Sequence, residues 1–149
     1  MFHAADPPNP VTAGHTNPQW AQLTRLAGDR AAILFEDLRR RVGTIVGLVE
    51  ELHYDGVAKR WTPRYRRGEE VLFTAHILPA ALEVTLTLDA GERLRLLSSP
   101  RLSSTMKHFI QRTPMVEGQV SVRVRLNSRV AVREFASLVV TRCRHSPEG

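Results

Sequence analysis

The chain has 149 residues, of which 42% are hydrophobic and 24% are charged. These proportions are typical of a soluble globular protein, and the length suits one domain with a hydrophobic core better than two. No apolar run approaches the roughly 20 residues that a membrane-spanning helix needs, and the first ten residues lack the basic start and apolar core of a signal peptide. Cys143 is the only cysteine, which excludes an intramolecular disulfide. We therefore expect a single cytoplasmic domain.

The net charge of +6 is consistent with nucleic-acid binding, because basic side chains that neutralise phosphates release counterions and bind without sequence preference. Of the 21 basic residues, however, only Lys59 and Lys107 are lysines. The chain is also rich in Ala, Val and Leu, a bias that a GC-rich genome produces without any functional reason. The charge alone leaves both interpretations open.

The first 17 residues contain several prolines and no periodic apolar face, so they predict a disordered N-terminal tail. Thr16-Asn17-Pro18 is typical of a helix start, with a capping side chain before a proline. A short helix to Ala27, closed by Gly28, is therefore expected after the tail.

A longer helix is predicted over residues 29–52, because apolar residues recur there at alternating spacings of three and four. These residues are Phe35, Leu38, Val42, Ile45, Val49 and Leu52. Gly43 and Gly47 inside this helix would each cost about 1 kcal/mol relative to Ala, which we interpret as a sign of close approach to a neighbouring backbone.

Residues 69–89 predict the central hairpin of a sheet. Val71 to Leu78 is almost wholly apolar, and Leu82 to Leu88 alternates apolar and polar residues with the period of a half-buried strand. A preceding strand is expected over residues 57–66. Because Pro63 has no amide hydrogen, that strand should lie at an edge or pair irregularly.

The second half of the chain predicts one or two helical turns over residues 92–97, a helix over 101–111, a strand over 119–126 and a last helix ending near Cys143. The expected fold class is α+β: a two-layer sandwich whose mostly antiparallel, four-stranded sheet is backed by the long N-terminal helix and the C-terminal helix. The domain should span residues 18–143, between tails at 1–17 and 144–149. One face of the sheet is left to solvent or to a ligand.

Several short segments of residues 54–142 resemble a small bacterial family, the domain of unknown function numbered 3788. The segments are Tyr54-Asp55-Gly56, Lys59 with Trp61, the basic turn Arg66-Arg67-Gly68, the strand end Ile77-Leu78-Pro79, the alternating strand from Leu82 to Leu86, and the helix start Ser98-Ser99-Pro100. Members commonly have further aromatic residues beside the first strand, where this chain has Thr or Arg. The resemblance implies a compact α+β domain and no activity that can be assigned to particular residues.

Common catalytic signatures are absent from the chain: it has no Gly-x-Gly-x-x-Gly, Walker loop, His-Glu-x-x-His or Gly-x-Ser-x-Gly. Cys143 and His145 form the only Cys/His pair at ligand-like spacing, and one pair does not complete a four-ligand zinc site. We therefore expect no catalytic residue, cofactor or metal, and an enzyme is the least supported class.

The candidate site is a ligand-binding surface on the open sheet face and the first strand. Its residues are Trp61, Arg64, Tyr65, Arg66, His76, Arg123 and Arg125. Arginine forks bind carboxylate or phosphate with two hydrogen bonds, and an aromatic ring beside them can stack on a planar ligand. Two structural interpretations stand beside this one: charges that protect an edge strand from association, and a histidine hydrogen-bonded across strands.

The sequence thus favours a non-enzymatic binding domain for a small anionic or planar ligand or an acidic protein partner. The alternative is weak, non-specific nucleic-acid binding through the same basic surface. The oligomeric state is left open.

Overall fold

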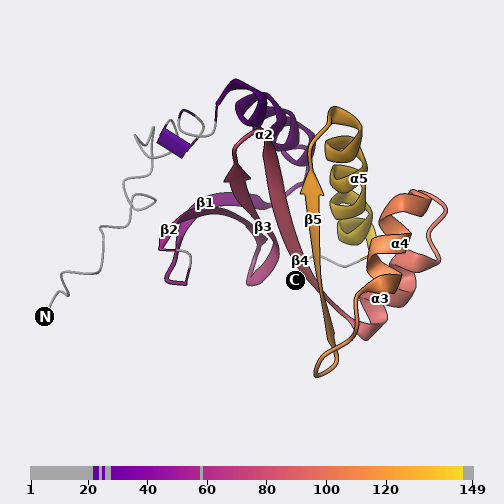
Figure 1. Ribbon diagram of the computed structural model, residues 1–149. Helices are drawn as coiled ribbons and strands as arrows, with labels where there is room; N and C mark the ends of the chain where they lie inside the picture. Colours follow the sequence, from indigo (N-terminus) through magenta and orange to yellow (C-terminus); the bar gives the residue numbers. More distant parts are fainter. Residues whose placement is uncertain (1–21, 24, 26–27, 58, 146–149) are drawn as a thin grey trace, which may run out of the picture.

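The computed structural model of the protein describes residues 22–23, 25, 28–57 and 59–145. The chain forms an α+β domain around one antiparallel sheet with the strand order β1-β2-β3-β4-β5. The elements are α2 (Asp29–Val42), β1 (Leu48–Asp55), β2 (Arg60–Arg67), β3 (Glu70–Leu78), β4 (Ala81–Asp89), α3 (Ala90–Leu97), α4 (Ser104–Arg112), β5 (Gln119–Leu126) and α5 (Arg129–His145). Figure 1 shows α2, α3, α4 and α5 beside β4 and β5, and the first three strands curling away from them.

The prediction of one helix over residues 29–52 was wrong, and so was the prediction of four strands. Helix α2 ends at Val42, Gly47 has a left-handed φ of 82°, and the fifth strand β1 begins at Leu48. Gly43 caps the end of the helix with an ordinary helical φ of −62°, and Gly47 is the glycine that turns the chain. The apolar stripe does not continue past the helix: Val49 and Leu52 are three residues apart and point to opposite faces of β1, so Val49 is exposed and Leu52 is buried.

Strand β2 lies inside the sheet, between β1 and β3, and not at an edge as one interpretation of Pro63 had it. The other interpretation, irregular pairing, agrees with the register. Pro63 is opposite Leu52 of β1, whereas the pairing with β3 covers Arg64 to Arg67 and shifts between Tyr65 and Arg66. The shift makes Leu72 an extra residue of β3, and such a bulge bends the strand.

The elements with strict local signals match their predictions closely. Strand β5 has the predicted bounds, and Ser128 caps α5 by accepting a hydrogen bond from the Ala131 amide. Helix α4 begins at Ser104, three residues later than predicted, because the side chain of Ser103 caps it. The predicted tail 1–17 and most of the predicted helix 18–27 lie outside the described residues, as do residues 146–149.

The core lies between the helices and one face of the sheet. Apolar residues of β4 and β5 alternate inward, and Phe135 of α5 meets Phe73 of β3 edge to face with ring centroids 5.1 Å apart. Phe35 of α2 and Leu86 of β4 are also completely buried. Burying such side chains contributes about 1.5–3 kcal/mol each. No helix in the described part of the chain is long and apolar enough to cross a membrane.

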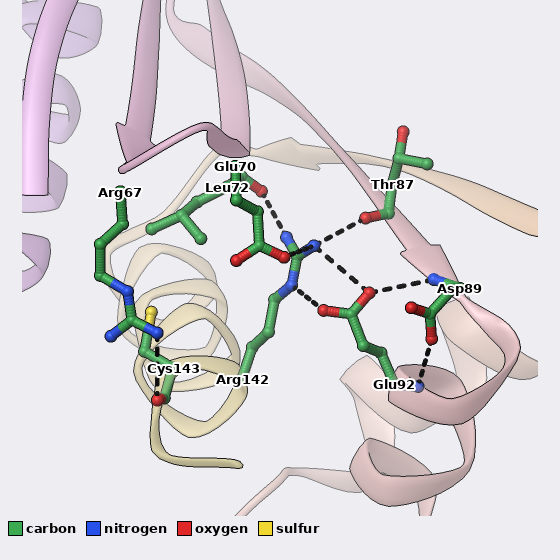
Figure 2. Close-up of polar contacts among 8 residues, drawn as sticks. All are labelled: Arg67, Glu70, Leu72, Thr87, Asp89, Glu92, Arg142 and Cys143. Carbon is green, nitrogen blue, oxygen red and sulfur yellow. Dashed lines mark hydrogen bonds and ion pairs between the residues drawn. The ribbon is translucent and has the colours of Figure 1, made fainter. Parts of the chain in front are cut away.

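A buried ionic cluster centred on Arg142 joins the end of α5 to three other elements (Figure 2). The Arg142 guanidinium donates to the carboxylates of Glu92 at 2.9 Å and Glu70 at 3.1 Å, and to the backbone carbonyls of Leu72 and Thr87, each at 3.0 Å. Glu92 also forms a reciprocal cap with Asp89 at the start of α3. The cluster therefore ties β3, β4 and α3 to the last helix.

The polar face of the sheet as a candidate binding site

The strand register aligns polar side chains in rows on the sheet face that points away from the helices. One row crosses all five strands, and it consists of Glu51, Arg64, Thr74, Thr85 and Arg123. The next row has two parts. His53 of β1 is opposite Thr62 of β2, and His76, Glu83 and Arg125 are opposite one another on β3, β4 and β5. We call these ten residues, together with their neighbours Asp55, Arg66, Thr87 and Ser121, the polar face.

On the β1 and β2 side of the polar face, the arginines are paired. Arg64 donates to Glu51 through Nε at 2.7 Å, and Arg66 donates to the other oxygen of the same carboxylate at 3.2 Å. Burial would raise the pKa of Glu51, but these two hydrogen bonds outweigh it and hold the pKa below its usual 4.5. Glu51 is therefore charged at neutral pH and occupies both arginines.

At the centre of the polar face, His76 of β3 contacts Asp55 at the end of β1, with Nε2 and Oδ2 3.4 Å apart. Strand β2 lies between them, and in a flat sheet the two outer strands would be separated by about 9.6 Å, twice the usual spacing. The two side chains thus meet across β2, and Figure 1 shows the first three strands curling away from the helices, so the polar face is concave here.

Two buried polar atoms on this concave face have no hydrogen-bond partner: Oγ1 of Thr62 and Nδ1 of His76. Thr62 is 3% exposed. Continuing the β2–β3 register two residues beyond the pair Arg64 and Thr74 puts Thr62 opposite His76. Because buried polar atoms are normally satisfied, these two atoms are an exception among the polar groups of this face.

On the β4 and β5 side, the charges are unpaired. Arg123 and Arg125 are exposed, and neither forms an ion pair with another described residue. Arg125 is opposite Glu83 in the register, without an ion pair between them. The hydroxyls of Thr87 and Ser121, 3.1 Å apart, continue the face toward the far end of the two strands.

The two aromatic residues of the predicted site lie on the other side of β2. Tyr65 is 1% exposed, stacks on Phe73 with centroids 4.6 Å apart, and donates its hydroxyl to Glu50 at 2.7 Å. Trp61 contacts Tyr54 edge-on at 5.4 Å. Neighbouring residues of a strand point to opposite faces, so these rings do not share a surface with Arg64 and Arg66.

Tyr65 belongs to a structural network at the end of α2. Arg39 donates two hydrogen bonds to Glu50, at 2.7 and 2.8 Å, and the same carboxylate accepts from the Tyr65 hydroxyl. Burial, together with the negative charge of Glu50, raises the pKa of Tyr65 well above its usual 10.0. Tyr65 is thus a neutral hydrogen-bond donor in the core, out of reach of a stacking ligand.

Five of the seven predicted residues therefore lie on the polar face, namely Arg64, Arg66, His76, Arg123 and Arg125. The sequence analysis missed Thr62 and Asp55. The alternation of β2 already placed Thr62 beside the arginines and could have revealed it. Asp55 was predicted to precede the first strand, at residues 57–66, and only the pairing of β1, β2 and β3 brings it to His76.

No family model matches the chain, and neither the search of curated proteins nor the search of solved structures found a match. The arrangement of the polar face itself is therefore the basis for the functional argument.

Proposed function

We propose that this domain is a non-enzymatic binding module that holds an anionic group on the β4 and β5 side of its polar face. The group is a carboxylate or phosphate, carried by a small ligand or by an acidic segment of a partner protein. The observation that carries the proposal is the contrast in pairing: Glu51 occupies Arg64 and Arg66, whereas Arg123 and Arg125 have no ion-pair partner among the described residues.

The spacing of these two arginines supports the proposal. They are two residues apart on one strand, so their side chains leave the sheet about 6.6 Å from each other on the same face. Each guanidinium can donate two parallel hydrogen bonds to a carboxylate or phosphate. The nearby hydroxyls of Thr85, Thr87 and Ser121 supply further donors, and His76 lies one strand beyond β4.

An anionic ligand is better supported than a planar one. Stacking needs an accessible ring, but Tyr65 is buried and Trp61 lies on the opposite face of β2. Binding to nucleic acid through the same arginines is the competing proposal, and its support is the net charge of +6. We propose a cytoplasmic setting, and membership of the family numbered 3788 remains a proposal that assigns no activity.

A thermal-shift screen tests the anionic proposal. The full chain is melted with citrate, with inorganic phosphate, with a poly-glutamate peptide and with a short DNA duplex, at about 50 and 200 mM salt. A ligand at a hundred times its dissociation constant stabilises by about 2.7 kcal/mol. The double variant Arg123→Ala, Arg125→Ala should lose this stabilisation, whereas the matched variant Arg95→Ala, Arg112→Ala, which removes two exposed arginines from α3 and α4, should keep it.

Comparing the melting temperatures at the two salt concentrations separates the anionic proposal from the nucleic-acid proposal. A protein with 6–10 phosphate contacts on DNA loses about 10³–10⁵ in affinity between 50 and 200 mM salt, so a shift by DNA alone, at low salt only, would favour the nucleic-acid proposal. If citrate, phosphate and the peptide all fail to shift the wild-type melting temperature, Arg123 and Arg125 are better explained as protection of an edge strand.

A further inference from the structure

Four arginines surround a hollow of about 400 Å³ on the helical side of the molecule. We call it the arginine groove, and its arginines are Arg41, Arg101, Arg133 and Arg144. Its lining also includes the hydroxyl residues Ser137 and Thr141. The polar face is on the opposite side of the sheet, so the groove is a separate place on the molecule.

Three segments that are distant in sequence bring these arginines together. Helix α5 carries Arg133, Ser137, Thr141 and Arg144 at spacings of four, four and three, which places them along one stripe of the helix. The opposite stripe of α5 is buried, as Phe135 shows. Arg41 comes from the last turn of α2, and Arg101 comes from the loop between α3 and α4. A local sequence pattern could not have shown this convergence.

The charge of the groove is poorly compensated. None of the lining residues is acidic. Arg41 is paired with Asp37, whose Oδ1 lies 3.1 Å from its Nε, but Arg101, Arg133 and Arg144 are exposed and form no ion pair with any other residue that the structure describes. The positive charges around the hollow repel each other, and the attraction of each arginine for a bound anion would offset this repulsion.

The size and charge of the groove indicate how large the ligand is and how many negative charges it carries. A volume of about 400 Å³ falls in the range of small-molecule sites, and a monocarboxylate would neutralise only one of several guanidinium groups. A chain of phosphates presents several charges and many acceptor oxygens to arginine forks, and it can accept a hydrogen bond from the hydroxyl of Ser137, which is partly exposed, unlike that of the buried Thr141. We propose that the arginine groove binds a compact ligand with two or more phosphate groups.

Titration calorimetry with inorganic tripolyphosphate, at about 150 mM salt, tests this proposal on the full chain. We expect the wild type to bind one equivalent and the double variant Arg133→Ala, Arg144→Ala to lose at least tenfold in affinity. Both side chains are exposed, so this variant should keep the wild-type melting temperature within about 2 °C without ligand. Arg133→Lys, Arg144→Lys should retain part of the affinity, because lysine keeps the charge but lacks the fork.

Two matched variants make the result specific. Arg95→Ala, Arg112→Ala removes the same charge elsewhere on the helical side, and Arg123→Ala, Arg125→Ala removes it from the polar face. Both should bind tripolyphosphate within twofold of wild type. No measurable binding by the wild type, or an equal loss in all three alanine variants, would overturn the proposal. A loss only in Arg123→Ala, Arg125→Ala would assign the phosphates to the polar face instead, and binding of a DNA duplex without tripolyphosphate binding would point to a macromolecular ligand.

Discussion

Arg142 and Arg123 both lie next to strand β4, but their surroundings are opposite. Arg142 is 4% exposed and donates to two carboxylates and two backbone carbonyls, one of them the carbonyl of Thr87 in β4 (Figure 2). Arg123 projects from the other side of the sheet, opposite Thr85 of the same strand, and is exposed without an ion-pair partner in the described part of the chain.

The difference shows how one residue type serves two purposes. Removing an ion from water costs several kcal/mol, and only complete pairing and hydrogen bonding offset that cost. Arg142 meets this condition within the protein, and its burial keeps it out of reach of a ligand in solvent. Arg123 and Arg125 are solvated by water, which a ligand can replace. The contrast between these two regions can be tested by four sets of variants.

The largest effect is expected for Arg142→Met. The substitution leaves Glu92 buried without its cation and two carbonyls without their donor, and breaking a buried pair in this way costs about 3–5 kcal/mol. The free energy of unfolding from urea denaturation measures the effect. Arg144→Ala, two residues further along α5, is the control and should change it by less than about 0.5 kcal/mol. A cost below about 1 kcal/mol for Arg142→Met would mean that the cluster does not hold α5 to the sheet.

The second test compares the two faces of β4 directly. Leu86 is buried against the helices, and Leu86→Ala should cost about 2–5 kcal/mol by urea denaturation, as large core truncations do. Thr85, the preceding residue, is on the polar face, and Thr85→Ala should cost about 0.5 kcal/mol or less. Equal costs at the two positions would contradict the assignment of the faces.

The third test concerns Tyr65, a core residue that the sequence analysis had assigned to the binding surface. Tyr65→Phe removes the hydrogen bond to Glu50 and should cost about 1 kcal/mol at pH 7. The pKa of Tyr65 is raised in the folded protein, so above about pH 10 the unfolded chain loses this proton while the folded one keeps it, and stability falls as the pH rises. Thermal denaturation between pH 8 and 11 should show a smaller decline for Tyr65→Phe than for wild type. Parallel declines would contradict the buried, neutral tyrosine.

The smallest effect on stability is expected for Arg123→Ala, Arg125→Ala. Because both side chains are exposed and unpaired, the free energy of unfolding should change by about 0.5 kcal/mol or less in the absence of ligand. The matched variant Arg64→Ala, Arg66→Ala breaks the pairing with Glu51 and should cost more. If Arg123→Ala, Arg125→Ala proved the more destabilising of the two in urea, these arginines would have a structural role that the described contacts do not show.

The parts of the fold that were predictable have signals that lie within a few residues of each other. The strict alternation of β4 and β5 predicted their bounds and buried faces, because a period of two is a property of the extended chain itself. Helix α2 was predicted too long, since Val49 and Leu52 happen to have helical spacing although they lie on opposite faces of strand β1.

The binding site was predictable only in part for a related reason. The alternation of β2 separates its aromatic residues from its arginines, so a closer use of the same pattern would have excluded Tyr65 from the site. The sequence had no means of showing which arginines are paired. Glu51 was expected in a helix, and its role in occupying Arg64 and Arg66 follows from the pairing of β1 with β2.

The sequence by itself determined the local features of this protein: the alternating strands, the cap of α5 by Ser128 and the turn at Gly68, where φ is 61°. Only the tertiary structure decided which charges meet. Arg142 finds its partners 50 to 72 residues away along the chain, and Asp55 reaches His76 across strand β2. Periodicity and capping depend on neighbouring residues, whereas these contacts depend on strand register, curvature and helix packing, which the whole chain sets together.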